Sequence, residues 1–233
     1  MRFCIAPSNR RRHWGLTNAL PTDLVAVPRP RQREMQALSA AQLGILWVSS
    51  RSSHWYPLWV LLGTAGLRIG EALGLKWSDV DLALGRLQVR RALQRQRGRG
   101  LVFVEPKSYR SRRMVCLCRL AVEALSELRQ RSDGDLVFVN RRGLAQDSSS
   151  VTDALKVALD RAGLPQIRVH DLRHTTATVL LEAGAHPKLV QDLLGHSTVA
   201  LTLNTYSHVT AGLSDQAART MDRVIGDQQL RAC

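Results

Sequence analysis

The sequence predicts an α+β fold that is mainly α-helical with a small antiparallel β-sheet. Apolar residues recur at helical spacing through most of the chain from Leu38 onward. Between residues 86 and 117 the pattern changes to alternation of apolar and polar residues, which is typical of strands. A hydrophobic fraction of 45% with 22% charged residues is that of an ordinary globular protein, so we expect a packed core.

The first 37 residues differ from the rest. An arginine triplet at 10–12 is followed by three prolines between residues 21 and 30. Prolines at short intervals with arginines among them are typical of an extended linker. We therefore expect residues 1–37 to be separate from a domain that covers 38–233.

Within that domain, Ser39 and Gln42 have the spacing of a capping box and predict the start of the first helix. A second helix is expected over 53–64, and closely spaced glycines then indicate a tight turn and a short helix. Further helices are expected at 119–131, 149–162, 171–183, 187–194, 198–206 and 213–228.

The alternating segments 86–90, 101–104 and 113–117 predict three antiparallel strands, and 136–139 predicts one more short strand. The loops at 95–100 and 107–111 are both basic.

The charge balance points to a polyanionic partner. The chain holds 33 Lys and Arg against 19 Asp and Glu, a formal net charge of +14, and nearly all of the cations are arginines. The planar guanidinium matches phosphate oxygens in pairs, so nucleic acid is the expected partner, ahead of a membrane surface. A biased base composition would explain the excess of Arg over Lys but not the net charge. No run of apolar residues approaches the ~18 that a membrane span needs.

The cysteines favour neither a disulfide scaffold nor a metal site. There are four, Cys4, Cys116, Cys118 and Cys233, and they are scattered. Cys116 and Cys118 fall on one face of an expected strand, without further metal ligands nearby in the sequence. We expect free thiols, no metal and a reducing cytoplasmic environment.

Three short blocks carry candidate chemistry. In the first, Gly66 and Gly70 flank Arg68, and glycines let backbone approach closely, which suits an arginine held rigidly against a ligand. Taken alone, such an arginine is more often a solvated residue of a helix–turn.

The second block is a His-x-x-Arg pair, His170 and Arg173, which share a face if the segment is helical. An imidazole and a guanidinium on one face can move a proton and hold a phosphate. Asp171 and His174 are candidates for supporting hydrogen bonds. A His-x-x-Arg pair found by itself on a helix is usually two solvent-exposed residues without a functional role.

The third block combines a corner with a tyrosine. Gly195 can end one helix and Ser197 can cap the next, which places His196 at the corner between them. Tyr206 lies near the end of that next helix; in isolation it would be read as a packed tyrosine.

The order of these blocks resembles the tyrosine recombinase (phage integrase) family. So do the phrases AGLRIGEALGLKWSDVD, HDLRHTTAT and LGHSTVALTLNTYSHV, and PKSYRSRRMV resembles the family's β-hairpin with its catalytic lysine. The resemblance extends over residues 38–210 and implies the catalytic-domain fold of the DNA breaking-rejoining enzymes. The residues that match the family's catalytic pattern are Arg68, Lys107, His170, Arg173, His196 and Tyr206.

The resemblance implies that Tyr206 attacks a DNA phosphate, leaving a 3′-phosphotyrosyl link and a free 5′-hydroxyl, without ATP. Arg68 and Arg173 would contact the nonbridging oxygens, which makes a metal cofactor unnecessary. Lys107 would protonate the leaving oxygen.

His170 and His196 would assist proton transfer and phosphate contact. Glu71, Asp171 and His174 would support the site. The partner would be double-stranded DNA, on which the segment after Tyr206 would join neighbouring subunits into a tetramer. The basic side chains expected to contact DNA are Arg95, Arg97, Arg99, Arg110 and Arg112.

Two features depart from the family pattern. Members normally carry a helical core-binding domain before the catalytic domain, whereas residues 1–37 resemble only its last helix and the linker, so the chain is expected to be truncated at its N-terminus. Cys116 stands where proline is usual, a position not needed for the chemistry. Three interpretations stay open: an active strand-transfer enzyme, a catalytically impaired DNA-binding remnant, and a relaxing topoisomerase of the same chemistry.

Overall fold

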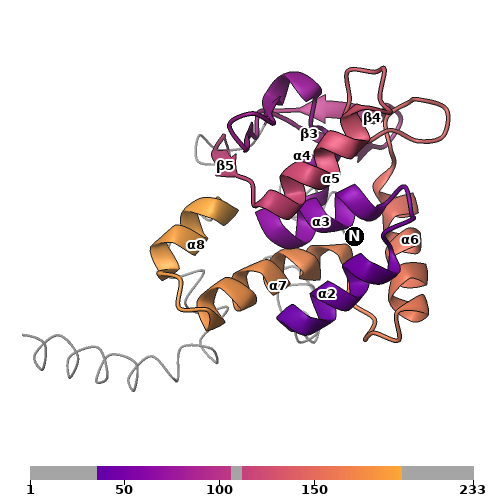
Figure 1. The fold of residues 1–233 in the computed structure, drawn as a ribbon. Helices are drawn as coiled ribbons and strands as arrows, with labels where there is room; N and C mark the ends of the chain where they lie inside the picture. Colours follow the sequence, from indigo (N-terminus) through magenta and orange to yellow (C-terminus); the bar gives the residue numbers. More distant parts are fainter. Residues whose placement is uncertain (1–35, 106–111, 196–233) are drawn as a thin grey trace, which may run out of the picture. The chain divides into compact units, whose positions relative to one another are not determined.

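The computed structural model describes residues 36–105 and 112–195 (Figure 1). Its α-helices are α2 (Ala40–Ser49), α3 (Tyr56–Ala65), α4 (Ile69–Leu73), α5 (Arg119–Arg129), α6 (Ser148–Arg161), α7 (Val169–Glu182) and α8 (Pro187–Leu194). Its strands are β1 (Val80–Asp81), β2 (Arg86–Gln88), β3 (Ala92–Gln96), β4 (Gly100–Val104) and β5 (Met114–Cys116), with a short 3₁₀ helix, η2 (Trp77–Asp79), before β1.

The predicted helices within the described residues are confirmed. The capping box of α2 is present: Gln42 N donates to Ser39 Oγ at 3.2 Å and Ser39 N to Gln42 Oε1 at 2.9 Å. The second helix begins at Tyr56 rather than at Ser53, because the Ser53 hydroxyl accepts from the backbone in a turn and Pro57 favours the first helical turn. The helices predicted at 198–206 and 213–228 lie outside the described residues.

Helix α3 forms the centre of the core. It is apolar on all sides, as expected of a helix surrounded by others, and Leu58, Trp59 and Leu62 are fully buried. It packs between α5 and α7 (Figure 1). The start of the domain is anchored to the same core, because Leu38 N donates to the buried Thr175 Oγ1 of α7 at 3.0 Å.

The fold class is confirmed, but the strands form two small sheets instead of one. Strand β2 pairs with β1 and β5, whereas β4 pairs with β3, which the sequence pattern did not predict. The alternation of apolar and polar residues did not reveal strand β3, because Leu93 is the only buried residue in it. The strand predicted at 136–139 is wrong: Val137 and Phe138 are consecutive and both buried, and the segment forms only isolated bridges.

Two glycines let β3 cross directly over α4. A Cβ on Gly70 would lie 2.8 Å from the Leu93 carbonyl oxygen, and one on Gly74 would lie 3.0 Å from Leu93 N. The close backbone approach predicted around Arg68 is therefore present. It fixes α4, and with it the loop that carries Arg68, against the β3–β4 hairpin.

No helix in residues 36–105 or 112–195 is long and apolar enough to cross a membrane. Cys116 and Cys118 are exposed free thiols. The same residues contain no cluster of three or more His, Cys, Asp and Glu side chains that could hold a metal ion.

Candidate active site

Arg68 stands in the short connection between α3 and α4. Helix α3 ends at Gly66, whose φ of 59° is in the left-handed region that glycine tolerates. Arg68 is extended and forms the N-cap of α4. Its side chain is 41% exposed, so the guanidinium reaches solvent while Nη1 donates to Glu71 Oε1 at 2.8 Å.

Glu71 lies beneath Arg68 and is buried. Its carboxylate accepts from the Arg68 backbone N–H at 3.0 Å, and from Arg113 Nη1 at 3.3 Å and Nη2 at 3.0 Å. Burial by itself would raise the pKa of Glu71, but the charge of Arg113 and the hydrogen bonds from both arginines lower it below its ordinary value. The carboxylate is therefore ionised and restrains the side chain of Arg68.

Arg173 is 2% exposed and joins two helix ends. Its Nη1 donates to the carbonyl of Gly66, at the end of α3, and its Nη2 to the carbonyl of Leu194, at the end of α8, both at 2.7 Å. A cation is favourable there because the last carbonyls of a helix carry partial negative charge. Gly66 admits this junction, since a Cβ would lie 2.5 Å from Leu194 Cδ2.

Arg113 belongs to the same cluster, although the sequence analysis did not single it out. Its side chain is 7% exposed, and besides Glu71 it binds the Leu193 carbonyl through Nε at 2.6 Å. A signal was present: Arg113 is two residues before the buried Val115 and so falls on the buried phase of the strand.

Asp171 supports the start of α7 rather than His170 or Arg173 directly. Its carboxylate accepts from the backbone N–H of Arg168 at 2.9 Å, and from Nε at 2.9 Å and Nη2 at 2.7 Å of the same residue. Burial would raise the pKa of Asp171, but the hydrogen bonds from Arg168 lower it. Arg168, another residue that the sequence analysis missed, thus repeats the arrangement of Arg68 with Glu71.

His170 and His174 stand one turn apart on α7, with ring centroids 4.8 Å apart and planes at 88°. Loss of hydration lowers the pKa of His170, and the charges of Arg173, Arg168 and Arg68 lower it further. Burial and the neighbouring His170 lower the pKa of His174 to about 4. Both imidazoles are therefore neutral at pH 7, and the positive charges of Arg68 and Arg173 both reach His170.

Four predicted site residues, Lys107, Arg110, His196 and Tyr206, lie outside the described residues. The elements that lead to them are described. Helix α8 ends in the left-handed Gly195 (φ 65°), as predicted, directly before His196. Arg113 and Arg173 bind the last two carbonyls of α8, so this helix ends beside the arginine cluster.

The predicted DNA-contacting arginines differ in their partners. Arg95 pairs with Asp147, with Nε at 2.7 Å from Oδ2, and Arg112 pairs with Glu105 at 2.7 Å. Arg97 and Arg99 are exposed between β3 and β4. Among residues 36–105 and 112–195, neither guanidinium has a hydrogen-bond or ion-pair partner.

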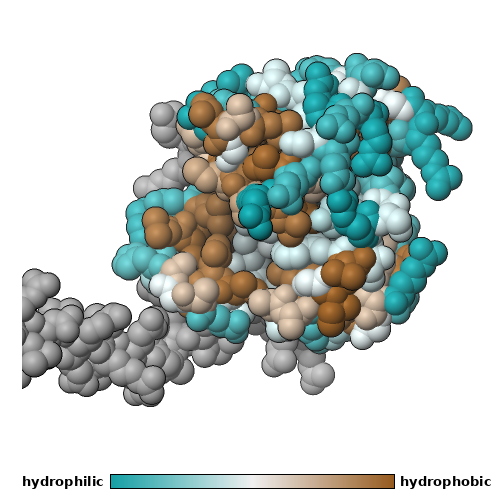
Figure 2. Space-filling model, viewed as in Figure 1, coloured by the Kyte–Doolittle hydropathy of each residue, from teal (hydrophilic) through white to brown (hydrophobic). Residues whose placement is uncertain are grey.

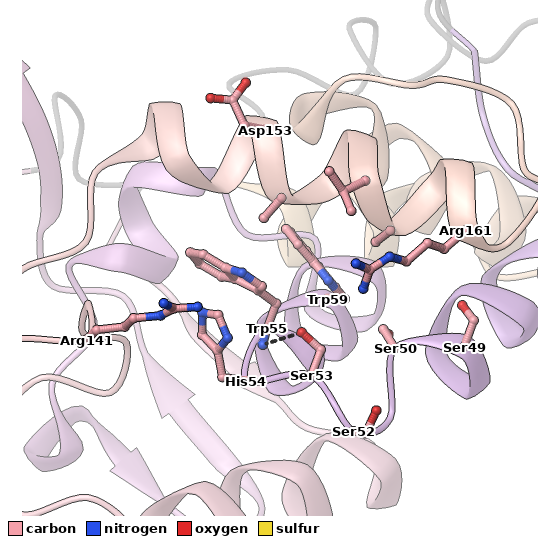
Figure 3. Close-up of a pocket in the computed structure, with 13 residues that line it drawn as sticks. Ser49, Ser50, Ser52, Ser53, His54, Trp55, Trp59, Arg141, Asp153 and Arg161 are labelled. Atoms are coloured by element: carbon pink, nitrogen blue, oxygen red, sulfur yellow. Dashed lines mark hydrogen bonds between the residues drawn. The ribbon is translucent and has the colours of Figure 1, made fainter.

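A pocket of about 520 Å³ lies elsewhere, between the α2–α3 loop and α6 (Figure 3). It is lined by Trp59 of α3 and by Trp55 directly before that helix, whereas Arg68 follows the other end of α3. Arg141 and Arg161 reach into it from opposite sides. No predicted site residue in the described part of the chain lines this pocket.

Comparison with known proteins places the chain in a family. The model of the phage integrase family matches residues 32–212. The chain belongs to the phage integrase family. It is 30% identical over 214 residues to a tyrosine recombinase XerC-like protein of Caldanaerobacter subterraneus subsp. tengcongensis, covering 82% of this chain and 55% of the relative. It is 30% identical over 194 residues to the transposase from transposon Tn916 of Enterococcus faecalis, covering 76% and 47%.

Solved structures show the same fold. The Tn1549 transposon integrase, in complex with circular intermediate DNA, matches with a TM-score of 0.76 at 23% identity, covering 93% of this chain and 76% of that one. The XerA recombinase matches with a TM-score of 0.62 at 29% identity, covering 85% and 66%. The predicted family and fold are therefore confirmed. The chain spans about half the length of the curated relatives that it matches.

Proposed function

We propose that this family member cleaves and rejoins DNA strands at a specific site through a 3′-phosphotyrosyl intermediate on Tyr206. The observation that carries the proposal is that Arg173 binds the Gly66 carbonyl, two residues before Arg68, with the neutral His170 one turn before Arg173 on α7. Relatives named as tyrosine recombinases and integrases, and solved integrases in complex with DNA, support it.

The chemistry follows from the charges at this junction. Oxygen of Tyr206 bonds to phosphorus while the bond from phosphorus to the 5′ oxygen breaks. Arg68 and Arg173 stabilise the charge that builds on the nonbridging oxygens. His170, neutral at pH 7, can take the proton of the tyrosine hydroxyl, and Lys107 supplies the proton that the 5′ oxygen needs.

The proposed partner is double-stranded DNA, with the arginines of the β3–β4 hairpin and the following loop on its phosphates. We assign His196 to phosphate contact. The proposal includes a tetramer on DNA, joined through the segment after Tyr206, and a cytoplasmic location. Apolar surface over α8, where Leu189 is 65% exposed, supports a contact between subunits on this face of the domain (Figure 2).

The test is covalent trapping. The protein is incubated with a nicked duplex from which the cleaved strand end diffuses away, and protein–DNA adduct is measured by denaturing electrophoresis. Tyr206→Phe should abolish the adduct, whereas Tyr56→Phe, the matched change at a buried tyrosine of α3, should retain it. An adduct that persists in Tyr206→Phe would refute the nucleophile.

DNA binding without any adduct in the unmodified chain would instead identify an impaired DNA-binding remnant. Two plasmids that each carry a site then separate the remaining alternatives. Joint recombinant molecules indicate a recombinase, whereas relaxed plasmids alone indicate a topoisomerase.

A further inference from the structure

We infer that Arg113 is a positioning residue that keeps the charge of Arg68 available to the DNA phosphate and links Arg68 to the end of α8. This inference rests on the proposed strand-cleavage function. Arg113 itself is buried and is not placed against the phosphate.

Arg68 and Arg113 share the carboxylate of Glu71. Its Oε1 accepts from Arg68 Nη1 at 2.8 Å and Arg113 Nη1 at 3.3 Å; its Oε2 accepts from the Arg68 backbone N–H and Arg113 Nη2, both at 3.0 Å. Each carboxylate oxygen is therefore divided between the two arginines. Two cations and one anion leave this group with a net positive charge.

The consequence is electrostatic. Without Arg113, the buried carboxylate of Glu71 would neutralise Arg68 alone, because no second guanidinium competes for its oxygens. A neutralised Arg68 would bind a phosphate less strongly, and would stabilise the transition state less, than one whose counterion is shared. Arg113 thus acts through Glu71 on a residue that is itself partly exposed.

Arg113 also binds the end of α8. Arg113 Nε donates to the Leu193 carbonyl at 2.6 Å, next to the Leu194 carbonyl that Arg173 holds at 2.7 Å. One guanidinium therefore connects the support of Arg68 with the helix end that precedes His196. Substitution of Arg113 would disturb both sides of the site.

Arginine is required at this position because its donors point to two sides. Nη1 and Nη2 bind the carboxylate while Nε binds the carbonyl. A lysine keeps the charge but has one nitrogen on a flexible stem, so it cannot span both partners.

The experiment is single-turnover cleavage of the nicked duplex at saturating protein, with DNA affinity and thermal stability measured in parallel. Arg113→Lys and Arg113→Gln should slow adduct formation by about 10- to 100-fold, the range of misplaced catalytic groups. DNA affinity should change by less than about 3-fold, since most phosphate contacts lie elsewhere. Arg119→Gln, at a nearby arginine that is exposed, should cleave at the rate of the unmodified chain.

A double-mutant cycle separates positioning from general destabilisation. If Arg113 acts by restraining Glu71, then Arg113→Gln combined with Glu71→Gln should cleave no more slowly than Arg113→Gln alone, and partial recovery is expected. Multiplying defects, or Arg113→Lys cleaving normally, would overturn the inference. If Arg113→Gln does not fold, Arg113→Lys and its combination with Glu71→Gln decide in the same way.

The two proposals fail differently. Absence of adduct from the unmodified chain contradicts the proposed function. If the unmodified chain forms the adduct and the Arg113 variants form it at the same rate, only the positioning role of Arg113 is contradicted.

Discussion

Arg68 and Arg173 are proposed to bind one phosphate, yet their surroundings differ sharply. Arg68 is partly exposed and restrained by a carboxylate, whereas Arg173 is buried and restrained by two backbone carbonyls. Removal of Arg173 would leave the carbonyls of Gly66 and Leu194 without this hydrogen-bond donor. A buried polar group without a partner lowers the free energy of unfolding by about 1–3 kcal/mol. Substitution of Arg173 is therefore expected to lower the stability of the fold as well as any activity. Substitution of Arg68, which is partly exposed, is the better test of catalysis alone.

Protonation of His174 should destabilise the fold. The pKa of His174 in the folded chain, about 4, is below its ordinary value of 6.5. Between these two pH values the imidazole is protonated in the unfolded chain but neutral in the folded chain. Stability should therefore fall as pH decreases through this window, with a loss of up to about 3 kcal/mol near pH 4.

Urea unfolding at several pH values measures the effect. His174→Gln should flatten the stability curve between pH 6.5 and about 5.5, above the range in which Glu71 and Asp171 take up protons in the unfolded chain. His170, whose pKa is also lowered, should leave a smaller slope of the same sign. An unchanged slope in His174→Gln would contradict the assignment.

At the residue scale, the family resemblance named three residues, Arg68, Glu71 and Arg173, that lie together in the described cluster. It did not name the buried arginine that supports them. Arg113 was placed at the start of the predicted strand 113–117 and given no role in the site, whereas its neighbour Arg112 was expected to contact DNA. In the structure Arg112 is exposed and pairs with Glu105, while Arg113 is buried. Only the phase relative to the buried Val115 distinguishes them, because composition carries no information about which face of a strand is covered.

At the scale of elements, helices were predicted closely because caps and apolar periodicity are local. The sheets were not, since β2 pairs with β5, whereas β3 and β4 form a separate hairpin. Pairing depends on contacts between segments far apart in the chain, and β3 has one buried side chain to signal its presence. The short helix α4 was predictable from its glycines, although their contact with β3 was not.

Two glycine substitutions test that contact. Gly70→Ala should destabilise the protein by about 1–3 kcal/mol, because the new Cβ would lie 2.8 Å from the backbone oxygen of Leu93, which cannot move without β3. Gly44→Ala is the matched control within α2: a Cβ there meets nothing within 4 Å. It should stabilise by about 0.5–1 kcal/mol through helix propensity.

Unfolding free energies in urea give both values, and adduct formation should fall more in Gly70→Ala than in Gly44→Ala because α4 begins directly after Arg68. Equal stability of the two variants would mean that β3 does not pack on α4 as described.

At the scale of the whole molecule, the excess of positive charge is only partly neutralised within the protein. Many cations of the described residues have carboxylate partners, as in the pairs of Arg51 with Glu127 and Arg119 with Glu123. Arg97 and Arg99, at the end of the β3–β4 hairpin, have none among those residues. Charges without an internal partner are the ones that gain most from a phosphate, so this hairpin end is where we expect DNA to be bound.

Salt dependence of DNA binding tests this expectation. The affinity for a short duplex is measured by fluorescence anisotropy across a series of salt concentrations. Each lost phosphate contact lowers the slope of log affinity against log salt by about 0.9, so Arg97→Gln with Arg99→Gln should lower it by about 1.8. Arg51→Gln with Arg119→Gln removes the same charge from residues already paired with Glu127 and Glu123, and should leave the slope nearly unchanged. Equal slopes for the two double variants would show that net charge, and not the hairpin, attracts the DNA; a reduced slope confined to the hairpin variant would place two phosphates at its end.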